Sequence, residues 1–536
     1  MKKLLALINL LLVVLLIWFI KSDLDDKISQ KIDSIINKNV YENELLKIKK
    51  NAKSRNKLIE LNIQPEHLDQ LLATRLEFLR VGYIGNDIAN PYHPAKISLG
   101  SKEYSVKLRF KGDFLDHISD IQKWSLKIKV LNNETIFGMK EFAIQRPETR
   151  NGFGEYAFHK VLHYNGMLSI PYDFIWVQQN GKDHGIYAYE GRMKNKFFKI
   201  NGVERQPILR INDELYFKAK RNLGNKAKRG LNLEDWSSYA AIIDAYQLDK
   251  ILSNKKLKKS FEIATTKLEN FRLGKLKAKE VFNITKLAKF YVIADLFSAY
   301  HAQQFPNLRF YYNSHDSLLE PIGFDADGLS SRPVFFGQEL AMSNDKIYNG
   351  RRYEHRLNYL LEDKDFVLEY HKYLAIFSRE KFIINMEDSL KNEFEERKGI
   401  SKILNYKHEF LRKNQAFIRS KIYPVKGVHA FLNDIKADSI ILNLSNPNYL
   451  ATEILSIQQN GKNIAKPVFN DWLRGREQNK VAPIVKAIFK TTEIKFDKKK
   501  QFYIRYKIPG IDSVYNDPIN LWNNQINDKS SESYIK

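Results

Sequence analysis

The sequence predicts an α+β protein with a two-lobed body, in which an N-terminal antiparallel sheet precedes a helical C-terminal lobe. Apolar residues alternate with basic residues over about 95–143, a pattern typical of strands that bury one face. Long amphipathic helical patterns follow over 231–300 and 353–422. From residue 425 onward the pattern again indicates short strands separated by turns, which predicts a separate β-sandwich-like domain.

Composition limits the chemistry that the chain can carry. Its 536 residues are 43% hydrophobic and contain no cysteine, so disulfides, thiolate zinc sites and cysteine nucleophiles are excluded. The formal net charge is +25, from 87 Lys and Arg against 62 Asp and Glu. Either a general bias toward lysine explains this charge, or a basic surface attracts anionic lipids or other polyanions. No RNP, zinc-finger or helix-turn-helix signature is present in the sequence, so we expect no nucleic-acid partner.

The first residues have the pattern of a membrane anchor. Lys2 and Lys3 precede an apolar run over 4–20, which Lys21 closes. These seventeen residues span about 25 Å as a helix, close to the thickness of the hydrocarbon core. A cleaved signal peptide starts in the same way but ends in small residues, whereas this run ends in bulky ones. We therefore predict an uncleaved transmembrane helix with its N-terminus in the cytoplasm, because positive charge is in excess before it.

Changes of pattern divide the chain into six parts. The predicted parts are a transmembrane anchor over 1–21, a helical stalk over 22–85, a β-rich N-lobe over 86–215, a helical C-lobe with metal-site strands over 216–424, the β-sandwich-like domain over 425–520 and a tail over 521–536. Pro65 interrupts the stalk and predicts the start of a short helix. The pairs Asn180-Gly181 and Asn460-Gly461 predict tight turns between strands.

Basic side chains in the N-lobe are candidates for binding phosphate. Lys127 and Lys129 lie on the same face of a predicted strand, and Glu190 follows a later strand, where it can pair with one of them. Lys111 begins a Lys-Gly-Asp segment that either covers a phosphate or simply joins two strands. An ordinary solvated basic face remains the alternative for the two strand lysines.

Acidic residues after an apolar strand form the sharpest candidate site. Asp325 and Asp327 follow the predicted strand over 319–324, and both can reach one hard cation such as Mg²⁺ if the chain turns there. The alternative is an ordinary polar turn. Asn307 directly precedes a predicted strand over 308–312, where it forms either an Asx turn or an amide ligand to a metal.

The candidate catalytic groups lie shortly before Asn307. A kinase-type catalytic loop places an aspartate base five residues before its Asn, and that position is Ala302 in this chain. His301, six residues before Asn307, is the nearest titratable substitute, and Asp295 lies twelve residues before it. We therefore take His301 and Asp295 as candidate catalytic residues, although a lone histidine is more often structural.

The order of the segments 111–113, 123–129, 185–190, 307–312 and 324–327 resembles that of the CotH-like (spore coat protein H) atypical kinases. The resemblance covers about residues 95–335. It implies a protein-kinase-like fold and transfer of phosphate from ATP to serine residues of exported or coat proteins. The implied site residues are Lys127 or Lys129 on the ATP phosphates with Glu190 as ion-pair partner, and Asn307, Asp325 and Asp327 on Mg²⁺ or Mn²⁺.

These observations favour a membrane-anchored kinase-like phosphotransferase. We expect it to be a single-pass protein of the bacterial cytoplasmic membrane that acts outside the cytoplasm on an exported protein or an envelope polymer. One alternative is a catalytically inactive kinase-like scaffold or binding protein of the cell envelope, which the missing loop aspartate and the appended β domain favour. Another is a protein that binds polyanions or anionic surfaces through its positive charge.

Overall fold

The chain divides into two compact units. The computed structural model describes residues 38 and 40–521, except for 86–87, 216–217, 219–221, 223–240, 305, 327–359, 361–362, 408, 470–471, 477–480, 493–496 and 498. The first unit comprises the chain up to Pro147 together with Asp173–Tyr189 and Phe394–Tyr406. The second unit comprises Glu148–Tyr172, Glu190–Glu393 and the chain from Lys407 onward.

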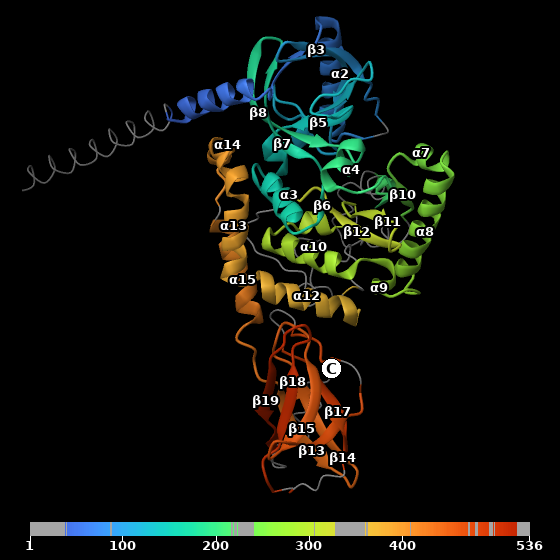
Figure 1. Ribbon diagram of the computed structural model, residues 1–536, viewed down its shortest axis with the longest axis vertical. Coiled ribbons are helices and arrows are strands. Elements are labelled where there is room, and N and C mark those ends of the chain that lie inside the picture. Colours follow the sequence, from blue (N-terminus) through green and yellow to red (C-terminus); the bar gives the residue numbers. More distant parts are fainter. Residues whose placement is uncertain are drawn as a thin grey trace, which may run out of the picture. The chain divides into compact units, whose positions relative to one another are not determined.

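A closed seven-stranded barrel forms the body of the first unit (Figure 1). In spatial order its strands are β1 (Leu58–Asn62), β2 (His93–Leu99), β3 (Lys102–Phe110), β4 (Leu126–Val130), β5 (Glu141–Gln145), β8 (Lys182–Gly191) and β7 (Tyr172–Gln179). Strands β1 to β5 pair antiparallel in chain order. The parallel pairing of β1 with β7 closes the barrel.

The inner face of the barrel collects the alternating apolar residues that predict the strands. Leu108 of β3 lies opposite Ile128 of β4, and both side chains are buried in one core cluster. The helix α2 (Pro65–Val81) adds Phe78 to this cluster, with its ring centroid 6.1 Å from that of Phe110 in an edge-on contact. The two alternating strands and the helix that begins at Pro65 are therefore confirmed.

The prediction of an N-terminal antiparallel sheet is wrong, because the strands form a closed barrel. The structure has a closed barrel instead, because β1 pairs antiparallel with β2 and in parallel with β7. Strand β1 also interrupts the stalk that the sequence predicts to be helical over 22–85. Strands β1 and β7 are parallel and far apart in the sequence, so no tight turn connects them. The local sequence pattern therefore cannot predict that they pair and close the barrel.

The prediction of a transmembrane helix is also corrected. In the part of the chain that the structure describes, no helix is long and apolar enough to cross a membrane. The long described helices carry charged residues along one face, which suits packing onto a core. The predicted span over 1–21 and residues 522–536 of the predicted tail lie outside the described residues. We therefore do not retain the single-pass placement in the bacterial cytoplasmic membrane.

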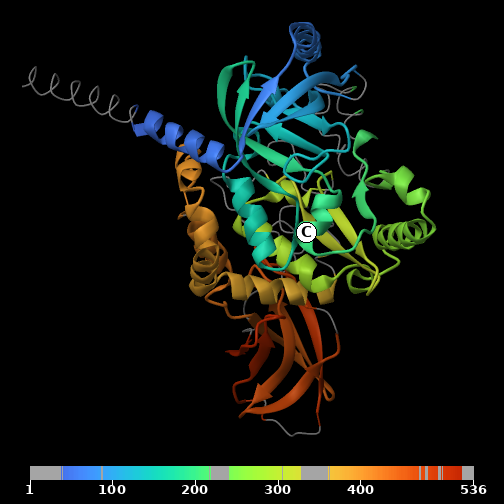
Figure 2. The same ribbon diagram turned by 45° about the horizontal axis from the view of Figure 1, so that its top comes forward.

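A five-stranded sheet positions the candidate site in the second unit (Figure 2). Its strands in spatial order are β10 (Ile243–Ala245), β9 (Ile208–Ile211), β11 (Arg309–Asn313), β12 (Leu318–Gly323) and β6 (Leu168–Ser169). Strands β11 and β12 form an antiparallel hairpin, and β12 pairs in parallel with β6. The largely apolar helix α10 (Ile284–Leu296) is buried against β12, α3 (Gly154–Tyr164) and α12 (Lys364–Phe377).

Further helices surround this sheet. In the described part of the second unit they include α4 (Asn195–Asn201), α7 (Leu248–Leu252), α8 (Lys255–Arg272), α9 (Ala278–Val281), α13 (Glu380–Glu395) and α15 (Glu409–Ile422). The 3-10 helices η2 (Pro147–Arg150) and η4 (Tyr300–Gln303) precede α3 and β11. The short helix α14 (Lys398–Ile403) belongs to the first unit. Helices therefore predominate over 241–422 in the part of the chain that the structure describes, together with strands β10, β11 and β12.

The C-terminal part of the second unit is one curled eight-stranded sheet, in place of the predicted β-sandwich-like domain (Figure 1). Its strands in spatial order are β19 (Val514–Pro518), β18 (Tyr503–Lys507), β15 (Glu453–Gln459), β16 (Lys462–Pro467), β17 (Ile484–Thr491), β14 (Ser439–Ser445), β13 (His429–Ile435) and β20 (Asn520–Leu521). The strands enclose a core of their own. The predicted tight turn between β15 and β16 is confirmed, with positive φ at Asn460 and Gly461.

Candidate functional site

The β11–β12 hairpin brings two of the predicted metal ligands to the same end of the sheet. Asn307 lies just before β11, and Asp325 lies just after β12. Because an antiparallel hairpin returns the chain to its starting edge, residues that flank it on either side become neighbours. Asp325 has a φ of 54°, a left-handed conformation that is uncommon for a residue other than glycine and that recurs at functional sites.

His301 lies between Asn307 and Asp325. Its Nδ1 is 3.3 Å from Nδ2 of Asn307 and 3.5 Å from Oδ1 of Asp325. The same nitrogen lies 3.2 Å from the backbone oxygen of Asp325. The amide of Asn307 also donates to the backbone oxygen of His301 at 3.1 Å, which holds η4 against the hairpin. Three residues predicted from two separate segments of the chain therefore lie close together.

Arg150 completes this cluster, and sequence reasoning missed it. Its Nε lies 2.7 Å from Oδ1 of Asp325, and the two side chains are only 14% and 10% exposed. Burial on its own lowers the pKa of Arg150, but the nearby carboxylates of Asp325, Glu190 and Glu155 outweigh burial and raise it. Arg150 is therefore a permanent cation beside the predicted metal ligand Asp325.

Glu155, in the first turn of α3, holds the chain just beyond Asp325. Its Oε2 accepts a hydrogen bond of 2.9 Å from the backbone N–H of Ala326, and its Oε1 lies 3.0 Å from Nε2 of His159. The close packing of α3 on β12 permits this contact, since a Cβ at Gly323 would overlap the side chain of Leu162. Glu155 was also missed, because no motif in its own segment points to it.

The predicted catalytic residue Asp295 is a buried member of the helix packing. Its Oδ2 accepts a 2.6 Å hydrogen bond from the hydroxyl of Tyr370, and its Oδ1 accepts one of 3.1 Å from Nε2 of Gln303. Gln303 belongs to the same 3-10 helix as His301. These bonds make Asp295 a positioning residue for η4. Glu190, predicted as a lysine partner, is buried and contributes to the electrostatic environment of Arg150.

The predicted phosphate-binding lysines lie in the first unit. Lys111 is buried and donates a hydrogen bond to Oε1 of Gln145. Lys127 is half-buried and Lys129 is exposed on β4, opposite Arg109 and Lys107 of β3. Residues 111–125 join β3 to β4 through the 3-10 helix η1 (Leu115–His117), so the Lys-Gly-Asp segment is not a simple hairpin turn.

The donor types in the second-unit cluster suit Mg²⁺ bound together with phosphate. Mg²⁺ takes one or two protein carboxylates and fills its other positions with phosphate oxygens and water. Asp325 and Asn307 supply one carboxylate and one amide oxygen at the same end of the hairpin. Among the described residues no group of three or more His, Asp or Glu side chains could hold a metal on its own. Asp327 lies outside the described residues.

No model of a known protein family matches this sequence, and no curated protein is significantly similar to it. The resemblance to the CotH-like kinases therefore rests on the order of the motifs within this chain.

Proposed function

We propose that the chain is a CotH-like phosphotransferase that moves a phosphate from ATP to a hydroxyl group of an exported protein or an envelope component. The observation that carries this proposal is the convergence of Asn307, His301 and Asp325 at the end of the β11–β12 hairpin. In kinases an Asn and an Asp hold the metal, and the residues that orient the acceptor lie close to them.

In this proposal, His301 is the general base. The acceptor hydroxyl loses its proton to His301, its oxygen forms a bond to the γ-phosphorus, and the bond from that phosphorus to the bridging oxygen of ADP breaks. Mg²⁺, when bound, would neutralise negative charge on the phosphates, with Asp325 and Asn307 as the residues that hold it. Asp295 and Glu155 keep the cluster in place through the bonds described above.

Arg150 supplies fixed positive charge to the same place. A guanidinium is well suited to the oxygens of a transferring phosphate, because its N–H groups match a pair of oxygens. The resemblance implies that Lys127 or Lys129 contacts ATP phosphates, and Lys111 is a further candidate because of its Lys-Gly-Asp segment. Of these, Lys127 and Lys129 lie on a barrel strand whose basic neighbours strengthen the local positive potential.

A second candidate function is a catalytically inactive kinase-like binding protein. The ion pair between Arg150 and Asp325 favours it, because the guanidinium neutralises the carboxylate that a metal would need. Ala302 at the usual position of the catalytic aspartate favours it as well.

A direct test is phosphate transfer by the purified full chain, given ATP labelled on the γ-phosphate together with Mg²⁺ or Mn²⁺. Incorporation into the protein itself and release of phosphate to water are both measured, so that no acceptor has to be known. We expect Asp325→Asn to lower the rate by about 100-fold or more, as for loss of a charge-stabilising group. His301→Gln should lower the rate by about 100-fold as well, as for loss of a general base.

Asp316→Asn is the matched control, because Asp316 is an exposed residue in the turn of the same hairpin. It should leave the rate unchanged. Nucleotide binding without transfer in any condition would reject the phosphotransferase and support the inactive binding protein. Neither binding nor transfer would reject both.

A further inference from the structure

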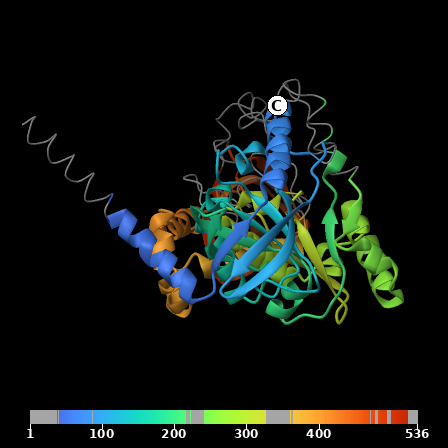
Figure 3. The ribbon, with the colours of Figure 1, turned by 90° about the horizontal axis from the view of Figure 1, so that it is seen from above.

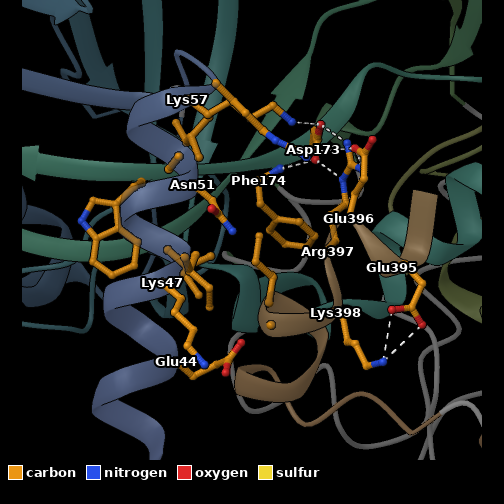
Figure 4. Close-up of a pocket in the computed structure, with 18 residues that line it drawn as sticks. Glu44, Lys47, Asn51, Lys57, Asp173, Phe174, Glu395, Glu396, Arg397 and Lys398 are labelled. Atoms are coloured by element: carbon orange, nitrogen blue, oxygen red, sulfur yellow. Dashed lines mark hydrogen bonds and ion pairs between the residues drawn. The ribbon is translucent and has the colours of Figure 1, made fainter. Parts of the chain in front are cut away.

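A pocket on the outside of the barrel lies wholly within the first unit and is not used by the proposed function (Figure 4). It lies between the helix over 40–54, strands β7 and β8, and the segment over 395–400. Figure 3 shows that helix beside α14, which begins within this segment. The cavity volume is about 280 Å³. Ligand pockets in proteins start at about 300 Å³, so a small molecule with one ring or a short chain suits it.

The floor of the pocket is apolar. Phe174 and Trp176 of β7 and Ile186 of β8 are all buried, and none of them belongs to the core cluster inside the barrel. The indole N–H of Trp176 donates to Oδ1 of Asp183 at 2.6 Å, which fixes the ring. Ile48 of the helix over 40–54 adds a further buried side chain. Such a floor favours a flat apolar group.

An ion-pair network anchors the wall that the segment over 395–400 forms (Figure 4). Asp173 accepts from Nε and Nη2 of Arg397, both at 2.8 Å, and from Nζ of Lys57 at 2.6 Å. Nη1 of Arg397 reaches Glu396 at 3.2 Å. Because these charges are mutually satisfied, they shape the pocket and are not its ligand-binding groups.

The groups that remain available to bind a ligand lie on one face of the helix over 40–54 and in the turn directly after it. Lys47, Asn51 and Arg55 are spaced four residues apart and all line the pocket. Within the described chain the ammonium of Lys47 and the side-chain amide of Asn51 have no hydrogen-bond or ion-pair partner. Arg55 uses one nitrogen, which pairs with Glu396 at 3.1 Å. Glu44 supplies the one carboxylate on this side of the pocket, so the hydrogen-bond donors of Lys47, Asn51 and Arg55 outnumber it.

We propose that this pocket is a binding site for a small molecule that carries an anionic group, a carboxylate or a phosphate monoester, on a compact apolar body. The apolar body lies on Phe174 and Trp176, and the anionic oxygens accept hydrogen bonds from Lys47, Asn51 and Arg55. The site is separate from the phosphotransferase proposal, since it uses none of the same residues.

The test uses three probes of nearly equal size, namely phenylacetate, 2-phenylethanol and phenethylamine, with phenyl phosphate as a fourth. Binding to the full chain is measured by ligand-observed NMR titration. We expect phenylacetate or phenyl phosphate to bind about tenfold more tightly than the neutral and cationic probes, as for one charge-assisted contact. Whichever of these two anions binds more tightly shows whether the ligand carries a carboxylate or a phosphate.

Three variants connect the binding to the pocket. Lys47→Glu should weaken the binding of the anionic probe by about tenfold. Lys53→Glu is the matched control, because Lys53 is exposed on the same helix but does not line the pocket. It should leave the affinity unchanged. Ala52→Leu places extra side chain in the pocket and should abolish binding, provided that thermal unfolding shows a folded protein.

Equal binding of the neutral probe would reject the anionic ligand. Tighter binding of phenethylamine would show that Glu44, and not the donors, dominates the site, and would also overturn the proposal. No binding of any probe, or equal losses in Lys47→Glu and Lys53→Glu, would reject the pocket as the site.

Discussion

At the scale of single residues, Arg150 neutralises the negative charge of Asp325. The two side chains are largely buried and 2.7 Å apart, so each neutralises the charge of the other. A buried carboxylate in this position lowers the stability of the folded protein unless a cation lies beside it. The cation is either a guanidinium or a metal ion. The same ion pair therefore affects both the stability of the cluster and the ability of the cluster to bind Mg²⁺.

The variant Arg150→Met keeps much of the side-chain length and removes the charge. The free energy of unfolding should fall by about 3–5 kcal/mol, because a buried carboxylate loses its partner. Millimolar Mg²⁺ should recover part of this loss, measured by chemical denaturation with and without the metal. The double variant Arg150→Met/Asp325→Asn is the control, in which Mg²⁺ should have no effect. A loss in Arg150→Met that Mg²⁺ does not change would show that Asp325 is not a metal ligand.

At the scale of elements, one carboxylate fastens the segment over 394–406 to the barrel of the first unit. Asp173 at the start of β7 binds both Arg397 and Lys57. Burial raises its pKa, but these two cations outweigh burial and lower the pKa to about 2. Since the unfolded value is 3.8, the contribution to stability is complete above that pH and is lost as the pH falls through about 2.

Asp173→Asn should therefore loosen this segment at neutral pH. The neutral amide cannot form an ion pair with Arg397, so the segment should open more often and trypsin should cleave after Arg397 or Lys398 faster than in the unaltered protein. We expect an increase of about tenfold or more in the cleavage rate, from the loss of about 2 kcal/mol that the pKa shift represents. Limited proteolysis with mass spectrometry identifies the cleaved bond. Asp183→Asn is a useful comparison, since Asp183 pairs with Lys49 at a more exposed position. A similar acceleration in both variants would contradict a specific role of Asp173.

Elements with local signals could be predicted, whereas their long-range partners could not. Alternation in β3 and β4 and the Asn-Gly pairs at 180–181 and 460–461 announce strands and turns directly. The convergence of Asn307 and Asp325 could also be predicted, because a hairpin between them places its two flanks together. Arg150 and Glu155 could not, since they reach this cluster only through the packing of α3 on β12.

At the scale of the whole molecule, a buried histidine joins the helices of the second unit to its C-terminal sheet region. Nδ1 of His371 on α12 lies 3.0 Å from the backbone oxygen of Pro509 and donates to it. The chain is close-packed there, because a Cβ at Gly510 would overlap the backbone of Leu368. Burial lowers the pKa of His371 to about 4, although the hydrogen bond to Pro509 partly opposes this.

The depressed pKa predicts an acid-sensitive connection. An unfolded histidine binds a proton near pH 6.5, whereas folded His371 remains neutral down to about pH 4. The unfolded state therefore gains protons first, and the free energy of unfolding should decrease by about 3 kcal/mol as the pH falls from 6.5 to 4. In His371→Gln, whose amide can still donate to Pro509, this part of the decrease should disappear. The exposed His315→Gln is the control that should keep it. Chemical denaturation at several pH values, followed by a probe in the second unit, measures the difference. Equal pH profiles for the protein and for His371→Gln would show that His371 accepts its proton without opening this connection.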